Sequence, residues 1–330
     1  MRTAHARVSQ RATDPDAATE ALANDVRFYL NQNPRQLPSK YLYDALGSAL
    51  FDAICQLPWY RVTRAELALL ARHAPDILGA FAPGDRLVEL GPGNGAKLAT
   101  LVAGGLPPKL PIEVHLVDVS DAALATAARG LTGFESLRIV THEATYETGL
   151  LQVSREAGGE RRTMVLFLGS NIGNFDPDAG VAFLRKVRSA LRSGDSLLLG
   201  ADLRKPEETL KLAYDDPLGL TAAFNLNLLV RLNRELDADI SLEGFRHEAL
   251  WNEEASRVEM HLVSRKSQRI RIPRAGVDLT LRDGERIWTE SSYKYEPIQI
   301  TRLLERCGFR VRSQWVDNDA RFALTLAAGD

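Results

Sequence analysis

Val88-Glu89-Leu90-Gly91-Pro92-Gly93-Asn94-Gly95 is the stretch that decides the fold of this 330-residue chain. It connects a predicted apolar strand, 86–90, to a predicted helix, 97–102, through three closely spaced glycines. Glycine allows a sharp turn and lets a ligand approach the backbone without clashing with a Cβ atom. The first turn of the following helix offers free N–H groups. This order of strand, turn and helix predicts an α/β fold with a ligand-binding turn.

Short apolar strands alternate with helical patterns through the middle of the chain, which is typical of a parallel sheet. The predicted strands cover 86–90, 113–118, 137–141, 164–168 and 196–200, and the helices between them include 97–102, 121–129 and 179–191. Glycines at the helix ends supply suitable stops. We therefore predict a doubly wound, Rossmann-like sheet.

The flanking segments predict a second, smaller α+β domain. Residues 33–64 are rich in aromatics, a helical run covers 206–236, and three strands at 257–265, 268–273 and 277–282 favour an antiparallel meander. A helix at 298–307 and strand patterns at 314–316 and 322–327 would complete the central sheet. We expect the sheet domain to hold 15–32, 65–202 and 294–330, the second domain to hold 33–64 and 203–293, and 1–14 to be a flexible N-terminus.

Composition is that of an ordinary globular enzyme, with 45% hydrophobic and 25% charged residues. The formal net charge of −2 gives no reason to expect nucleic acid or an anionic membrane as partner. No apolar run is long enough for a membrane helix, and no signal-peptide core follows the basic N-terminus. Two cysteines and scattered histidines predict no disulfide scaffold and no metal site. We expect a cytoplasmic monomer.

The glycine turn alone leaves several ligands open. Gly91-x-Gly93-x-x-Ala96 also fits a dinucleotide fingerprint, and a turn that serves only chain geometry is a further alternative. Glu89 precedes the glycines, where phosphate-binding turns usually keep an apolar residue. Asp118 ends the second strand, where a carboxylate can bind both hydroxyls of a ribose. An acidic rim favours S-adenosylmethionine, which carries a sulfonium cation and no pyrophosphate.

Longer strings narrow the prediction further. They are Leu37-Pro38-Ser39-Lys40-Tyr41-Leu42-Tyr43-Asp44, Gly47-Ser48-Ala49-Leu50-Phe51-Asp52, Leu57-Pro58-Trp59-Tyr60-Arg61-Val62-Thr63-Arg64, Phe167-Leu168-Gly169-Ser170-Asn171-Ile172-Gly173-Asn174, Tyr214-Asp215-Asp216, Thr221-Ala222-Ala223-Phe224-Asn225, Asn233-Arg234-Glu235-Leu236 and Thr289-Glu290-Ser291-Ser292-Tyr293-Lys294. Together they resemble the histidine-specific Nα-methyltransferase family of ergothioneine biosynthesis, over residues 20–328.

The resemblance implies the transfer of three methyl groups from S-adenosylmethionine to the α-amino nitrogen of L-histidine, which gives Nα,Nα,Nα-trimethylhistidine (hercynine). It also implies a Rossmann-like domain for the cofactor and a second domain for the amino acid. Carried over by motif, the cofactor residues are Gly91, Lys97, Asp118, Thr145 and Tyr146. The substrate residues are Phe51, Tyr60, Asn174, Tyr214, Met260, Glu290 and Ser292, with Tyr43 beside the reacting amine.

The residue types suit these roles. Glu290 and Ser292 alternate along a predicted strand, so their side chains share one face and can serve the ring nitrogens of an imidazole. Asn174 and Tyr214 are expected at the carboxylate, and Phe51 and Met260 at the pocket wall. A tyrosine hydroxyl such as that of Tyr43 can orient an amine through one hydrogen bond.

Some alternatives stay open at this point. Thr145 stands where the family usually has an acidic residue beside the adenine, although the aromatic Tyr146 that follows is kept. A relative that methylates another aromatic amino acid, such as tryptophan, should lose the carboxylate of Glu290. A nicotinamide-dependent oxidoreductase and a partner-binding protein that has lost catalysis are the other candidates.

Overall fold

The computed structural model describes residues 15–156 and 161–329, and these form two compact units. The first unit holds Val62–Arg204 and the chain from Lys294 onward. The second holds the described chain up to Arg61 together with Lys205–Tyr293. The N-terminus that we expect to be flexible, residues 1–14, lies outside the described residues.

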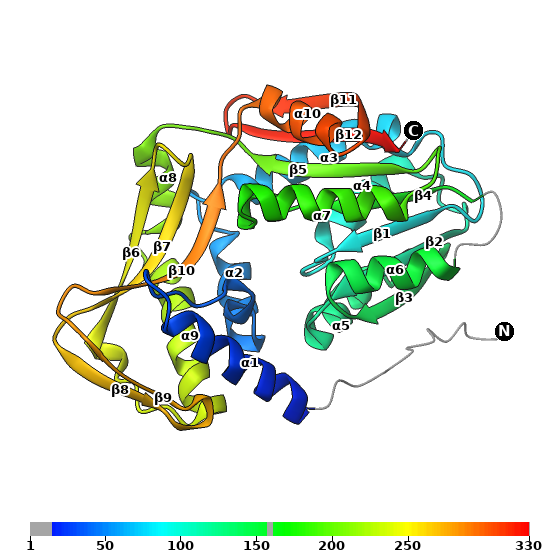
Figure 1. Cartoon of the computed structure of the whole chain (residues 1–330). Coiled ribbons are helices and arrows are strands. Elements are labelled where there is room, and N and C mark those ends of the chain that lie inside the picture. The colour runs from blue at the N-terminus through cyan, green and yellow to red at the C-terminus, as the bar shows by residue number, and fades with distance from the viewer. Residues whose placement is uncertain (1–14, 157–160, 330) are drawn as a thin grey trace. The chain divides into compact units, whose positions relative to one another are not determined.

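A seven-stranded sheet in the order β11-β12-β5-β4-β1-β2-β3 forms the centre of the first unit (Figure 1). The strands are β1 (Arg86–Leu90), β2 (Ile112–Asp118), β3 (Leu137–Glu143), β4 (Thr163–Phe167), β5 (Ser196–Asp202), β11 (Phe309–Asp317) and β12 (Phe322–Gly329). Strands β1 to β5 are parallel, whereas β12 runs antiparallel to both β5 and β11. The predicted parallel sheet with a C-terminal hairpin is therefore confirmed.

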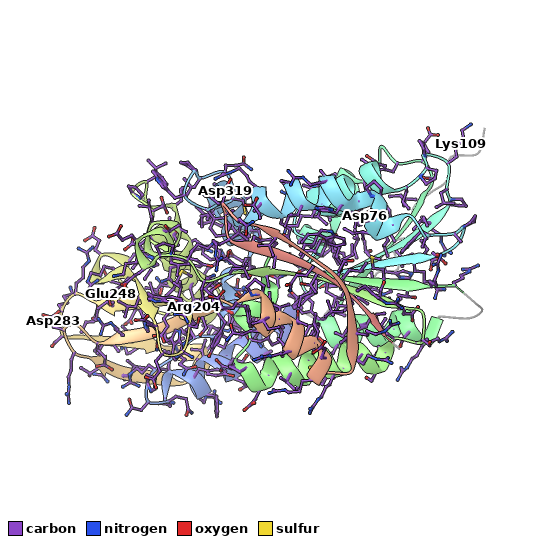
Figure 2. The ribbon with its side chains drawn as sticks, turned by 90° about the horizontal axis from the view of Figure 1, so that it is seen from above. Asp76, Lys109, Arg204, Glu248, Asp283 and Asp319 are labelled. Atoms are coloured by element: carbon purple, nitrogen blue, oxygen red, sulfur yellow. The ribbon has the colours of Figure 1, made fainter. Side chains whose placement is uncertain are left out.

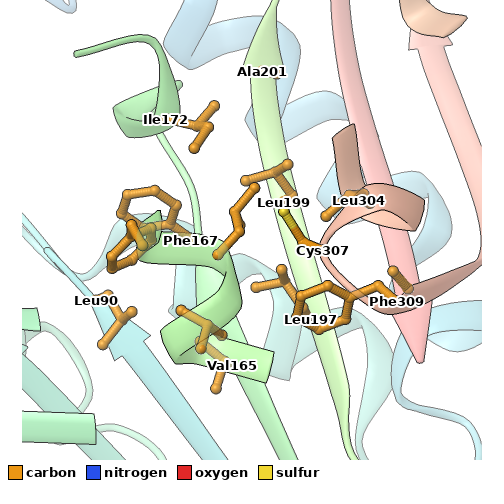
Figure 3. Close-up of a cluster of buried hydrophobic side chains, with 14 of the residues drawn as sticks. Leu90, Val165, Phe167, Ile172, Leu197, Leu199, Ala201, Leu304, Cys307 and Phe309 are labelled. Carbon is orange, nitrogen blue, oxygen red and sulfur yellow. The ribbon is translucent and has the colours of Figure 1, made fainter. Parts of the chain in front are cut away.

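Helices cover both faces of this sheet. They are α3 (Val62–Leu78), α4 (Ala96–Gly105), α5 (Asp121–Gly130), α6 (Tyr146–Glu156), α7 (Pro177–Ala190) and α10 (Pro297–Arg306). Apolar residues of α6, α7 and α10 pack with Leu197, Leu199 and Ala201 of β5 in one buried cluster (Figure 3). Because side chains alternate along a strand, Gly200 faces the opposite side, where α3 lies against it. Burial on both faces explains the nearly continuous apolar strands.

The second unit combines helices with two small antiparallel sheets. Its elements are α1 (Pro15–Leu30), α2 (Ala45–Ile54), α8 (Glu207–Tyr214), α9 (Leu220–Leu236), β6 (Phe245–Asn252), β7 (Arg257–Ser264), β8 (Gln268–Ile272), β9 (Val277–Leu281) and β10 (Arg286–Tyr293). One sheet has the order β10-β7-β6, and β8 pairs with β9 in the other. The predicted antiparallel pairing of 268–273 with 277–282 is confirmed, but the three-stranded meander is wrong, because β7 pairs with β6 and β10 and not with β8.

The long helix predicted for 206–236 is two helices. Pro217 has no N–H to donate to a continuing helix. The carboxylate of Asp216 accepts hydrogen bonds from the backbone N–H groups of Leu218, Leu220 and Thr221 at 3.0, 3.2 and 2.8 Å, which satisfies the open N-terminus of α9. The chain thus stops one helix and starts another within five residues.

Helix α1 belongs to the second unit, which corrects the assignment of residues 15–32 to the sheet domain. The Arg27 guanidinium donates a hydrogen bond to the carbonyl of Ala275 at 2.7 Å, and the Tyr41 hydroxyl donates one to Asp25 at 2.7 Å. Both contacts join α1 to parts of the second unit. The first of them spans 248 positions of sequence, which no local pattern could reveal.

Figure 2 labels several charged side chains that lie at the outside of their unit, among them Asp76 and Asp319. Lys109, in the loop before β2, and Asp283, in the turn before β10, are both exposed. Within the described residues, no helix combines the length and the apolar character that crossing a membrane requires.

Candidate functional site

The glycine turn lies at the carboxyl end of β1, between β4 and β2, where the strand order reverses. In open α/β sheets this is the position where ligands bind. Gly91 has a φ of +73°, and its N–H donates a hydrogen bond to the carbonyl of Val117 at 2.9 Å. A Cβ atom at this position would lie 2.8 Å from the Tyr146 hydroxyl and 3.1 Å from the Asn171 amide nitrogen. Only glycine fits at position 91. The structure thus places two of the predicted cofactor residues, Gly91 and Tyr146, next to each other.

A buried charge cluster lies beside the turn. Glu89 is 1% exposed, and its Oε2 atom accepts no hydrogen bond from the described residues. Burial raises the pKa of Glu89 to about 8, with the positive charge of Lys97 opposing the shift and the negative charge of Glu66 adding to it. The Lys97 ammonium lies 2.8 Å from a carboxylate oxygen of Glu66. The arrangement offers an acceptor for a cation close to the glycine turn.

Asp118 is the last residue of β2, and Thr145 is the last residue of the short loop between β3 and α6. The carboxylate of Asp118 accepts a hydrogen bond from the Ser120 N–H at 2.9 Å, and burial raises the pKa of this carboxyl above its ordinary value. The Thr145 hydroxyl lies 3.0 Å from the Thr148 hydroxyl and accepts from its N–H at 3.4 Å, so it serves the first turn of α6. The Asp118 carboxylate is oriented by the Ser120 N–H, whereas the Thr145 hydroxyl already has a structural role.

Tyr146 presents its hydroxyl to the turn from a ring that is packed in the core. The ring contacts Phe167, with centroids 5.5 Å apart, and Phe183, at 6.1 Å. Desolvation, with smaller effects of Asp118 and Glu147, raises the pKa of the Tyr146 hydroxyl. Tyr146 is therefore a neutral aromatic wall with one polar atom.

Asn174 ends a short 3-10 helix, Asn171–Asn174, that follows β4 in the first unit. The segment is fixed by Ser170, whose φ of 59° is left-handed and whose hydroxyl accepts a hydrogen bond from the Asp202 N–H at 2.9 Å. Asn174 and Tyr214 are both expected to bind the substrate carboxylate, but they belong to different units. Their shared role stays a prediction.

Five aromatic rings of the second unit form a continuous cluster. Tyr43 contacts Phe51 and Phe224, with ring centroids 5.5 and 5.3 Å apart. Phe51 contacts Tyr60 at 6.0 Å, and Tyr60 contacts Tyr214 at 6.2 Å. The predicted residues from 43 to 60 and Tyr214 are thus brought together, although more than 150 positions separate them in sequence.

The polar end of this cluster is fixed by hydrogen bonds. The hydroxyls of Tyr214 and Ser292 lie 2.9 Å apart. His247 Nε2 lies 2.8 Å from the carbonyl oxygen of Tyr214, so this nitrogen carries the proton and donates it. The other ring nitrogen of His247 then accepts from the Asn225 amide at 2.9 Å. Burial lowers the pKa of His247, which agrees with a neutral ring that anchors Tyr214.

Glu290 shares a face of its sheet with Ser292 and Met260. Glu290 pairs with Met260 across β10 and β7, and a β-bulge between Trp288 and Glu290 shifts the register. The buried Thr289 hydroxyl donates to the Met260 carbonyl at 3.0 Å, and the Trp288 indole N–H donates to the Glu290 carbonyl at 2.9 Å. The bulge that directs Glu290 is thereby held on both sides.

Two residues near these clusters carried no predicted role. Phe224 lies at the centre of the aromatic cluster, and the string Thr221-Ala222-Ala223-Phe224-Asn225 was the signal that could have identified it. Glu66 lies completely buried in α3, where a lone glutamate in a helical pattern is typical of a solvated surface. Among the described residues, no group of three or more His, Cys, Asp or Glu side chains is arranged to hold a metal ion.

The chain is similar in sequence to several known proteins. The family model for histidine-specific, S-adenosylmethionine-dependent methyltransferases matches residues 22–329. The chain is 38% identical to a histidine N-alpha-methyltransferase of Mycolicibacterium smegmatis over 94% of this chain and 96% of that protein. It is also 38% identical to one of Mycobacterium tuberculosis, over 95% and 96%. An L-tryptophan methyltransferase of Psilocybe serbica is 26% identical, over 88% and 87%.

Proposed function

Because the chain belongs to the family of histidine-specific, S-adenosylmethionine-dependent methyltransferases, we propose that it methylates the α-amino nitrogen of L-histidine. Three transfers give Nα,Nα,Nα-trimethylhistidine (hercynine) for ergothioneine biosynthesis. The observation that carries the proposal is the 38% identity to histidine N-alpha-methyltransferases over nearly the whole of both chains. The earlier alternative of a nicotinamide-dependent oxidoreductase is wrong, since the family uses S-adenosylmethionine.

The first unit fits the cofactor. Gly91 leaves the space that a Cβ would fill, and the open oxygen of Glu89 can accept from a cationic ligand. Asp118, at the end of β2, would bind the ribose hydroxyls, and Lys97, which interacts electrostatically with Glu89, would contact the cofactor. Tyr146 would pack against the adenine, with Thr145 beside it through its backbone, since its hydroxyl serves α6.

The second unit fits the amino acid. Tyr60, Glu290 and Ser292 would bind the imidazole, between walls formed by Phe51 and Met260. Tyr214 would bind the substrate carboxylate together with Asn174. A carboxylate and a hydroxyl suit an imidazole, whose ring offers a donor and an acceptor, better than an indole, which offers one donor alone. The pair on β10 therefore supports histidine over tryptophan as the substrate.

The chemistry asks mainly for positioning. The bound cofactor supplies an activated methyl group on a sulfonium, so the side chains need only present a neutral amine in line with it. We assign Tyr43 to this task, because its hydroxyl can orient the amine through one hydrogen bond while Phe51 and Phe224 hold its ring. With the donor bound, the amine would form the new N–C bond as the methyl–sulfur bond breaks, and each proton that it loses would pass to water.

Glu290→Ala tests the imidazole assignment. We expect the KM for histidine to rise about 10- to 100-fold, since a hydrogen bond to a charged group is lost, while the Kd for S-adenosylmethionine changes little. Steady-state kinetics with varied histidine and calorimetric titration of the cofactor measure the two effects.

Glu248→Ala is the matched control. Glu248 lies on β6 of the same sheet, but its carboxylate pairs with Arg246 and Arg286 at the surface. This variant should keep the histidine KM of the wild type. Equal losses of histidine and cofactor binding in Glu290→Ala, or an unchanged histidine KM, would show that Glu290 does not bind the imidazole.

A further inference from the structure

Glu66 is a charged residue in an apolar environment. It lies on α3 with an exposure of 0%, and its neighbours on that helix, Ala65, Leu69 and Leu70, are buried as well. A carboxylate loses its hydration at such a place, and it is stable there only if other groups replace the water. The interactions of Glu66 therefore indicate why a charge is kept in this core.

The partners of Glu66 come from two segments around the cofactor turn. The Gly169 N–H, directly after β4, lies 2.9 Å from each of the two carboxylate oxygens. The Lys97 ammonium, in the first turn of α4, lies 2.8 Å away. One carboxylate thus links α3, α4 and the end of β4 at the carboxyl edge of the sheet.

The sheet makes room for this carboxylate. A Cβ atom on Gly200, in the middle of β5, would lie 2.0 Å from Glu66 Oε1. Every other residue is excluded at Gly200 as long as Glu66 keeps its position. If α3 and β5 met here for packing alone, apolar side chains would fill both positions. We interpret the missing side chain at Gly200 as space for the Glu66 carboxylate.

The charge of Glu66 acts on the cofactor site through Lys97. Lys97 and Glu89 interact electrostatically, and Glu89 lies in β1 directly before Leu90, which ends the strand at the glycine turn. With Glu66 present, the positive charge of Lys97 is cancelled beside the glycine turn. Without Glu66, the Lys97 ammonium would lose its nearest carboxylate at low dielectric, close to the turn to which the proposed function assigns the cationic donor.

We propose that Glu66 is a positioning residue that fixes the Lys97 ammonium and cancels its charge, so that the site binds the cationic methyl donor in preference to its uncharged product. The inference rests on the proposed function for the identity of the donor. S-adenosylmethionine and S-adenosylhomocysteine share the adenosine and the amino acid tail. They differ in the sulfur, which is a sulfonium in the donor and a neutral thioether in the product. Glu66 therefore controls the ratio of the two affinities.

Glu66→Gln tests the proposal, because the amide keeps the size of the side chain and removes its charge. We expect the Kd for S-adenosylmethionine to rise at least 10-fold and the Kd for S-adenosylhomocysteine to change less than 3-fold, both by calorimetric titration without histidine. The double variant Glu66→Gln with Lys97→Met should restore the wild-type ratio, even if both affinities are lower. Equal changes for the two ligands, or no change, would overturn the proposal and leave Glu66 a packing residue.

Glu113→Gln is the matched control. Glu113 is a buried carboxylate that pairs with Arg86, but it lies at the start of β2, opposite Arg86 and at the far end of β1 from the turn. Its loss should leave the ratio unchanged. If Glu66→Gln does not fold, Lys97→Met tests the same charge balance by removing the positive charge. The Kd for S-adenosylmethionine must then fall relative to the Kd for S-adenosylhomocysteine. Histidine methylation by the wild type is measured separately, so failure of the proposed function is seen there and not in this ratio.

Discussion

At the residue scale, Glu89 gives the clearest dependence on pH. Its pKa rises from 4.5 to about 8 in the folded protein, chiefly through burial. Between these two values the folded state holds a proton that the unfolded chain releases, so the stability contributed by this group falls as the pH rises from about 5 to 8. Above pH 8 the folded protein bears the whole cost of the buried charge.

Glu89→Gln removes this dependence. We expect the ligand-free variant to match the wild type near pH 4.5 and to exceed it at pH 9 by up to about 5 kcal/mol, the value that corresponds to the pKa shift. Urea denaturation at the two pH values measures the difference. A variant whose stability falls with pH as steeply as that of the wild type would show that Glu89 is not the buried acid.

At the scale of elements, the bulge in β10 is what directs Glu290. Thr289→Val keeps the β-branched shape but removes the hydrogen bond to the Met260 carbonyl. The free energy of unfolding should fall by about 1–2 kcal/mol, because a buried hydrogen bond is lost. The KM for histidine should rise about 5-fold with kcat nearly unchanged, since Glu290 loses its fixed direction.

Thr325→Val provides the comparison for that variant. Thr325 is buried in β12 of the first unit, and its hydroxyl accepts a hydrogen bond from Gln314 at 3.1 Å. It should lose stability to a similar degree while the histidine KM stays at the wild-type value. If both variants leave that KM unchanged, the bulge does not position the imidazole-binding carboxylate.

Elements also show where sequence patterns succeed and fail. The strands buried on both faces could be predicted because continuous apolar runs between glycine turns have few other interpretations. The break between α8 and α9 was missed although Asp216 and Pro217 are strong stop signals, because the amphipathic pattern continues past them. Strand β6 was missed although it forms a local hairpin with β7 across residues 253–256, whereas the pairing of β7 with β10 depends on long-range contacts that period-2 patterns do not specify.

At the scale of the whole molecule, the motifs of a known family predicted which residues lie together in the second unit. Hydrophobic patterns and residue types alone did not predict it. Tyr43, Phe51, Tyr60 and Tyr214 meet in one cluster, and only the resemblance to a family placed them together beforehand. The place of α1 and the burial of Glu66 were not predicted, because both depend on tertiary packing that overrides the local pattern. The assignment of the cofactor to the first unit and of histidine to the second is our proposal.

The central claim is the methylation of histidine on its α-amino nitrogen, and one measurement tests it most directly. The purified protein is incubated with S-adenosylmethionine and an equimolar mixture of the twenty amino acids, and the products are analysed by mass spectrometry with fragmentation. We predict histidine that carries three additional methyl groups, all on the α-nitrogen. Methylated tryptophan or another amino acid in place of histidine, methyl groups on the imidazole, or the absence of any methylated product would contradict the claim.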